Sequence, residues 1–368
     1  MGVCAVIAGT LSRYFGLHFL GTVIAVFAGV FGLVALIDYV EMMRRYSDVA
    51  NLSSLLVAKT SLYRVPQVAE RVMPFCILIG AMSCYLSLSR RLELVIARAA
   101  GVSAWQFIMP AMVVAFVFGA VATTVYNPIA ALMFERSKHL EAEISGEYPA
   151  GPQPQSGGLW IQQASGDVQS IINAASSRSQ GVALDTVTIF NFDAAGRFRE
   201  RIEAKSATLE AGHWRLEDAH IFARGALNRD IDSFNFPTTL TPEQVRETFS
   251  TPEAVPFWQL PFYIDMAESA KLAAAGYRLQ YQKLLARPFL LSAMVLLAAA
   301  FSLRFFRFGG VQKMVLGGIT AGFLLYVMSK ITDDLSKAEL LYPFAAAWLP
   351  VLAGGLTGFV ALLHLEDG

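Results

Sequence analysis

Charged residues are scarce in this sequence, and their signs cancel. Asp, Glu, Lys and Arg make up 16% of the 368 residues, whereas 55% are hydrophobic, and a soluble domain carries about 25% charged residues. This composition argues against an ordinary cytosolic enzyme. The 29 basic and 29 acidic residues give a net charge of zero, so nothing in the charge balance indicates binding to nucleic acid.

Motifs for catalysis and cofactor binding are also missing. The sequence has no G-x-x-x-x-G-K-[ST] phosphate loop, no H-E-x-x-H zinc motif and no G-x-S-x-G nucleophile turn. Its cysteines (Cys4, Cys76 and Cys84) form no C-x-x-C or Cys/His zinc spacing, and its five histidines are scattered. We therefore expect buried, inert thiols, no catalytic residue, and no metal or cofactor in this chain. Any energy-driven activity must depend on a partner.

Long apolar runs, in contrast, are abundant. Six segments approach the ~20 apolar residues that a helix needs to cross a membrane, and lipid demands a helix because it cannot bond exposed backbone groups. They are Gly16–Asp38, Pro66–Leu88, Trp105–Tyr126, Leu284–Leu303, Val315–Met328 and Leu340–Leu363. Pro66 suits the first turn of the second helix, Pro74 is expected to kink it, and the fifth helix should continue through Lys330. No basic residue precedes Arg13, so we expect the first span to be retained rather than cleaved as a signal peptide.

Lys and Arg in the short turns predict the orientation of these spans. The turn after the second span carries Arg90, Arg91 and Arg98, and the turn after the fourth carries Arg304, Arg307 and Lys313. Both turns are therefore assigned to the cytoplasm together with both termini. The region between the third and fourth spans then lies outside, in the periplasm if the cell is Gram-negative.

That inserted region predicts an all-β domain. From about Trp160 to Pro261, short stretches of period two rich in β-branched and aromatic residues alternate with Gly-containing turns, as in a sandwich, jelly roll or open barrel. We divide the chain into residues 1–135, a jellyroll-like domain at 136–261, and 262–368, which begins with a connecting helix at Phe262–Gln282. The residues expected to supply much of the β interior are Trp160, Phe190, Phe192, Trp214, Leu216, Phe222, Phe234 and Phe236. They form only a core if the domain is closed, and could hold acyl chains if it is open.

The segment Ser89–Ser103 (SRRLELVIARAAGVS) predicts a short amphipathic helix, at about residues 89–101, in the turn after the second span. It is either a connector lying on the membrane or a coupling helix that enters a groove of a cytoplasmic ATPase. Two further pairs, Gly318/Gly322 and Gly354/Gly358, permit close approach of helices. They serve either packing within the chain or a subunit interface.

The order of three spans, a β domain and three spans, with LELVIARAAGVS after the second span, resembles the LptF/LptG (YjgP/YjgQ) lipopolysaccharide export permeases. GLW at Gly158–Trp160 and AAGYRLQYQKLLARPF before the fourth span are similar to the LptG branch. The resemblance covers nearly the whole chain. It implies six helices with a periplasmic β-jellyroll, in a complex with an LptF-like subunit, an LptB-like ATPase dimer that uses ATP and Mg²⁺, and a single-span LptC-like protein. Such a complex extracts lipopolysaccharide from the inner membrane and passes it towards the outer membrane.

The resemblance also implies roles for particular residues. It assigns Leu92, Glu93 and Leu94 to the ATPase contact and places the first and fifth spans at the lateral gates of a lipid cavity. It implies that Arg44, Arg45, Arg136 and Lys138 face the phosphates of lipid A, although arginines at a span end could instead only anchor it at the interface. Trp160, Phe190, Phe192 and Trp214 are the expected acyl path. Ala35 stands where a lysine is expected in the first span.

Two other functions remain at this stage. One is a mechanical subunit that transports nothing and transmits ATPase motion to a periplasmic partner. The other is a membrane enzyme, which the absence of a catalytic constellation makes the weakest interpretation. Lipid bound between the first and fifth spans would distinguish a transporter from both.

Overall fold

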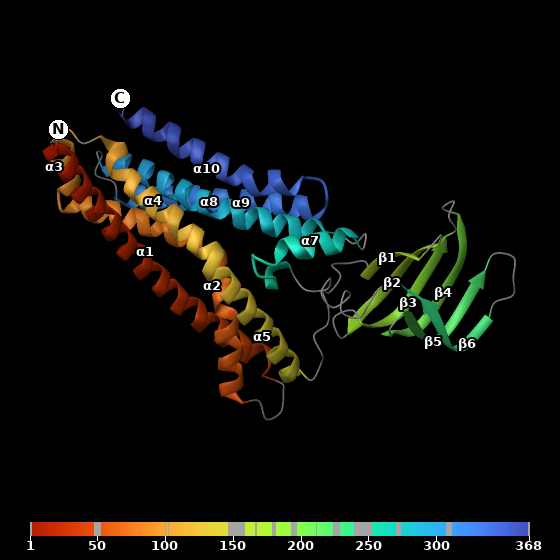
Figure 1. The fold of residues 1–368 in the computed structure, drawn as a ribbon. Helices are drawn as coiled ribbons and strands as arrows, with labels where there is room; N and C mark the ends of the chain where they lie inside the picture. The colour runs from red at the N-terminus through yellow and green to blue at the C-terminus, as the bar shows by residue number, and fades with distance from the viewer. Residues whose placement is uncertain are drawn as a thin grey trace.

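A computed structural model describes residues 2–47, 53–99, 101, 103–145, 159–165, 168–178, 182–192, 197–210, 212–223, 229–238, 252–269, 274–306 and 311–366. A bundle of long helices and a separate β sheet make up this structure (Figure 1). Both chain termini lie at one end of the bundle, which we call the termini end. The sheet lies beyond the opposite end, which we call the sheet end.

Within the described residues, the bundle contains six helices that are long and apolar enough to cross a membrane, as the sequence predicts. The third span is one continuous helix in three parts, since a π-helical segment, η1, joins α4 to α5. The long elements are α1 (Gly2–Arg45), α2 (Ser54–Arg90), α4 (Ala104–Val121), η1 (Ala122–Tyr126), α5 (Asn127–Ser145), α8 (Ala275–Phe306), α9 (Val311–Lys337) and α10 (Pro343–Glu366). The short ones are α3 (Glu93–Ala99), the 3₁₀ turn η2 (Pro252–Ala254) and α7 (Leu260–Ser269).

Several predicted boundaries are wrong, mostly because the helices continue past their apolar runs. Pro66 lies inside α2 rather than in its first turn, since α2 already begins at Ser54. The third span continues as α5 to Ser145, so the predicted boundary at residue 136 falls within a helix. The single connecting helix predicted at Phe262–Gln282 is instead α7, which ends at Ser269, and the beginning of α8. Interfacial polar residues can continue a helix because its backbone bonds are internal.

Close helix packing holds the bundle together around α8. A Cβ on Gly358 of α10 would meet the backbone of Leu297 at 3.0 Å, and one on Gly119 of α4 would meet the backbone of Pro288 at 2.6 Å. The glycines of both predicted small-residue pairs face side chains or backbone of neighbouring helices of the same chain. These pairs therefore serve packing within the chain.

The sheet is antiparallel, and its strand order follows the sequence from β1 to β6. Its strands are β1 (Leu159–Ser165), β2 (Val168–Arg178), β3 (Ala183–Phe192), β4 (Phe198–Glu210), β5 (His213–Ala223) and β6 (Arg229–Pro237). An all-β domain inserted between the third and fourth spans is thus confirmed. Trp214 is 0% exposed on one face of this sheet. Figure 1 shows the strands as one curved sheet, and a curved sheet can enclose the side chains of one face.

Candidate functional site

At the termini end, α3 lies directly between the second and third spans. The chain leaves α2 through Arg91 and a Leu92 with a φ of 61°, and α3 then begins at Glu93. The helix is therefore shorter than the predicted 89–101, because Ser89 and Arg90 still belong to α2. An acidic residue in the first turn suits the positive end of the helix dipole.

One face of α3 packs against the bundle, and another face is exposed. Leu94 is 4% exposed and belongs to the apolar core of the bundle, so it fixes α3 to the spans instead of facing a partner as predicted. Leu92 and Ile96 are exposed, and the hydroxyl of Tyr14 in α1 interacts with the Glu93 carboxylate. The surface that α3 offers thus combines two apolar side chains with one carboxylate.

At the sheet end, a cavity of about 350 Å³ lies between α2, α8, α9 and α10. We call it the charged chamber. Its charged lining residues are Arg71, Lys283, Arg287, Lys330 and Lys337 on the basic side and Glu70, Glu253 and Asp333 on the acidic side. Charged groups inside a helical bundle of mostly apolar spans are costly and usually functional.

Ion pairs neutralise only part of this chamber. Arg287 pairs with Glu70, Lys283 with Asp333 at 2.6 Å, and Lys330 with Asp334 at 3.1 Å. Among the described residues, neither Arg71 nor Lys337 has an ion-pair or hydrogen-bond partner. The chamber therefore presents uncompensated positive charge.

Two buried acceptor atoms also line the chamber. The Oε2 atom of Glu70 and the Oε1 atom of Gln67 have no hydrogen-bond partner among the described residues. Buried acceptors of this kind are normally bonded to water or a ligand. Positive charge beside free acceptors is complementary to a molecule that carries both an anionic group and hydroxyl donors, such as a phosphorylated sugar.

The predicted phosphate contacts lie outside this chamber. Arg44 and Arg45 end α1 and are exposed, with Arg44 paired to Glu41 at 3.0 Å. Arg136 and Lys138 lie exposed on α5. Sequence reasoning missed Arg71, Arg287 and the other chamber residues because each is a single charge within or beside an apolar run. The charged residues within or beside the apolar runs of α2 and α8 were the signal in the sequence that could have indicated this chamber.

The predicted acyl path in the sheet divides between two faces. Trp214 and Leu216 are buried on the interior face, together with Ile189 and Ile202 of neighbouring strands. Phe190 and Phe192 alternate with the buried Ile189 and Asn191 along β3, so they point to the opposite face. One surface therefore cannot include all four predicted residues. The side chain of Trp160 lies outside the described ones.

The reason for the division is a local irregularity in the strands. Thr186 has a φ of 50° and Asp218 a φ of 56°, and neither has a ladder partner, although the pairing before and after each keeps one register. The alternation of inward and outward side chains shifts by one residue at these positions. Leu184 and Val187, three residues apart, are therefore both buried.

Two spans have little cover within this chain. In the most apolar window of α1 only 6% of residues are buried, and in α9 22%, against 67% in α8. These are the first and fifth spans, which the resemblance places at lateral gates. Ala35 is half-buried on α1.

No cluster of three or more His, Cys, Asp or Glu that could hold a metal occurs within the described parts of the chain.

These features define a multi-pass membrane protein with a β domain inserted between its third and fourth spans. The chain belongs to the LptF/LptG family, because the profile of the lipopolysaccharide export system permease LptF/LptG matches residues 13–364. It is 23% identical over 349 residues to the lipopolysaccharide export system permease protein LptG of Escherichia coli K12, covering 93% of this chain and 94% of that protein. It is 24% identical over 355 residues to LptG of Haemophilus influenzae, covering 93% and 95%.

Proposed function

We propose that this chain is the LptG-type subunit of an ABC transporter that extracts lipopolysaccharide from the inner membrane. The charged chamber carries this proposal, because it combines positive charge and free acceptors within an apolar bundle. A phosphorylated glycolipid headgroup is complementary to both features, because its phosphate is anionic and its sugar hydroxyls are hydrogen-bond donors. The chamber accommodates a phosphate or a sugar ring, whereas Arg44, Arg45, Arg136 and Lys138 are proposed to meet further phosphates on the rest of the headgroup.

Removing such a lipid from a bilayer requires work. Each CH₂ transferred out of an apolar environment costs about 0.8 kcal/mol, and lipopolysaccharide carries several acyl chains. This chain contributes one wall of an apolar cavity, and its weakly covered α1 and α9 are proposed to form gates with an LptF-like subunit and a single-span LptC-like protein. The ATP and Mg²⁺ chemistry is assigned to an LptB-like dimer that binds α3 from the cytoplasm. The sheet end then faces the periplasm.

The contact with the ATPase is tested by reversing the charge of Glu93. Glu93→Lys should reduce co-purification of the ATPase from detergent at least tenfold while membrane insertion is unchanged, since the carboxylate would meet a basic residue of the partner (about 1–3 kcal/mol for a charge-assisted bond). Glu339→Lys is the matched control, because Glu339 lies in the turn between α9 and α10 at the sheet end. Equal ATPase recovery with both variants would contradict the proposed contact.

The chamber is tested by the lipid that co-purifies. The double substitution Arg71→Gln/Lys337→Gln should lower the lipopolysaccharide bound per complex several-fold, as measured by mass spectrometry of the extracted lipid. Lys313→Gln is the control, since Lys313 is an exposed cation at the termini end of α9. Unchanged lipid content in the double variant would remove the chamber from the headgroup path.

A further inference from the structure

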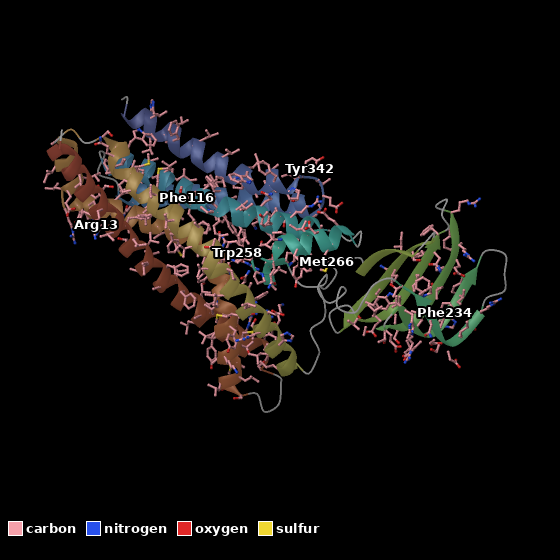
Figure 2. The ribbon with its side chains drawn as sticks, viewed as in Figure 1. Arg13, Phe116, Phe234, Trp258, Met266 and Tyr342 are labelled. Atoms are coloured by element: carbon pink, nitrogen blue, oxygen red, sulfur yellow. The ribbon has the colours of Figure 1, made fainter. Side chains whose placement is uncertain are left out.

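A hydrogen-bonded junction connects the return segment of the β domain to the third span. The indole Nε1 of Trp258 donates to the carbonyl oxygen of Thr124 at 3.1 Å, and the amide of Phe257 donates to Asn127 Oδ1 at 3.0 Å. We call Thr124, Asn127, Phe257 and Trp258 the linker joint. Figure 2 shows Trp258 beside the helical bundle, on the side that faces the sheet.

The local sequence explains why the joint lies here. Thr124 lies within the π-helical segment η1, Asn127 is the first residue after it, and such segments are frequent at functional sites. Residue 128, four positions after Thr124, is a proline without an N–H, so the Thr124 carbonyl lacks its regular helical donor and accepts the indole N–H of Trp258 instead. Asn127 is 0% exposed.

The joint is anchored on both sides by further contacts. Asn127 Nδ2 donates to Glu70 Oε1 at 2.9 Å, which ties the joint to the buried Glu70–Arg287 pair of α2 and α8. The ring of Phe257 stacks on Tyr281 with centroids 5.6 Å apart. Gln67 Nε2 donates to the carbonyl of Glu253 in the same return segment at 3.1 Å.

Both ends of the inserted region adjoin one helix. α5, which ends at Ser145, is the last described element before β1, and the return segment that begins at Pro252 binds η1 and the start of α5 through the joint. The opposite end of this helix begins at Ala104, and α4 is the next helix after α3. The α4–η1–α5 helix therefore extends from the region of α3 to the joint.

We infer that the α4–η1–α5 helix is the lever that carries ATPase motion to the β domain, and that Asn127 and Trp258 are positioning residues that keep the return segment fixed to it. This inference rests on the proposed function, and it assigns the coupling within that function to particular residues. The joint stays closed through the cycle, because a joint that opened would release the return segment from the lever.

The test uses the full chain in its reconstituted complex. Trp258→Phe keeps the aromatic ring and removes the indole donor. It should lower the lipopolysaccharide released per ATP hydrolysed by roughly two- to tenfold, the effect of one hydrogen bond, while the ATPase rate is retained. Trp348→Phe is the matched control, since the Trp348 indole bonds Gln282 between α10 and α8, away from the joint. Equal coupling in the two variants would overturn the inference.

A crosslink provides a readout that a folding defect would not produce. With the native cysteines replaced by alanine, Thr124→Cys/Trp258→Cys should be uncoupled, and a short bifunctional thiol crosslinker should restore release per ATP. Release per ATP that stays low after complete crosslinking would refute the inference.

Hydrogen exchange distinguishes a failure of the lever inference from a failure of the proposed function. ATP should alter exchange in the β strands of the wild-type complex, and this change should be smaller in Trp258→Phe, whether or not lipid is released. A wild-type complex that releases no lipopolysaccharide refutes the proposed function alone. An ATP-dependent change of equal size in the variant refutes the lever.

Discussion

Asn127 and Glu70, 57 residues apart in the sequence, are joined by a buried hydrogen bond of 2.9 Å between Nδ2 and Oε1. The same carboxylate oxygen accepts from Arg287. Three helices thus share one carboxylate that is 3% exposed, at the point where the return segment of the β domain binds. A buried charge of this kind is retained only when it is paired and hydrogen-bonded.

Breaking this pair from one side should strongly destabilise the chain. Glu70→Gln leaves the Arg287 charge uncompensated, and we expect the free energy of unfolding to fall by about 3–5 kcal/mol. The double variant Glu70→Gln/Arg287→Gln should recover part of that loss. Thermal unfolding in detergent, followed by tryptophan fluorescence, measures both. The control is Lys330→Gln, which removes the exposed pair with Asp334 and should cost less than about 1 kcal/mol.

Neighbouring glycines of α10 should differ in their tolerance of a methyl group. A Cβ on Gly358 would meet Leu296 Cβ at 2.8 Å, whereas one on Gly355 would meet nothing within 4 Å. We expect Gly358→Ala to lower the free energy of unfolding by about 1–3 kcal/mol through overpacking, and Gly355→Ala to change it little. If Gly355→Ala were the more damaging in the assembled complex, Gly355 would lie at a subunit interface instead.

The two faces of the sheet should differ in lipid contact. Phe234 packs against the buried interior cluster, and Phe190 lies on the other face. A benzoylphenylalanine placed at Phe234 should capture lipopolysaccharide during ATP-driven transport, because acyl chains require an apolar interior. The same probe at Phe190 is the control. Capture from Phe190 alone would mean that the interior is only a structural core.

Pairing of the β5 and β6 strands should depend on pH through His220. Its Nδ1 lies 2.7 Å from Asp230 Oδ1, and this hydrogen bond raises the pKa of His220 above its ordinary value of about 6.5. The charged imidazole is favoured in the folded state, so its contribution is complete below the ordinary pKa and is lost as pH rises through the raised one. Hydrogen exchange of residues 229–237 should show more protection in wild type than in His220→Gln at low pH. The difference should vanish at high pH, and a difference that grows with pH would contradict this assignment.

The sequence predicted the architecture well because burial in lipid imposes a simple rule. Any helix that crosses the hydrocarbon core must be apolar for about 20 residues, so six runs such as Leu284–Leu303 were sufficient to identify six spans. The period-two pattern between them was sufficient to identify a β domain. Motif comparison then pointed to Glu93, which lies in a short helix after the second span, although this helix begins at Glu93 and not at Ser89.

The charged chamber and the linker joint could not be predicted from apolar runs or period-two patterns in the sequence. Glu70, Asn127 and Arg287 are isolated polar residues on three separate helices, and no local pattern states that they meet. The residues of the predicted acyl path divide between two faces for a related reason, since the face to which side chains point shifts at Thr186, which has a positive φ. Period-two counting assumes a regular strand and cannot detect such an irregularity.

The sequence by itself determined which segments enter the membrane and which fold outside it, because transfer free energies depend on local composition. Only the tertiary structure decided that the glycine pairs pack within the chain, that Phe190 and Trp214 lie on opposite faces, and that the return segment binds the third span. These relationships depend on how helices and strands approach one another over long sequence separations. Hydrogen bonds and close packing select that approach, and they act between residues that no local pattern connects.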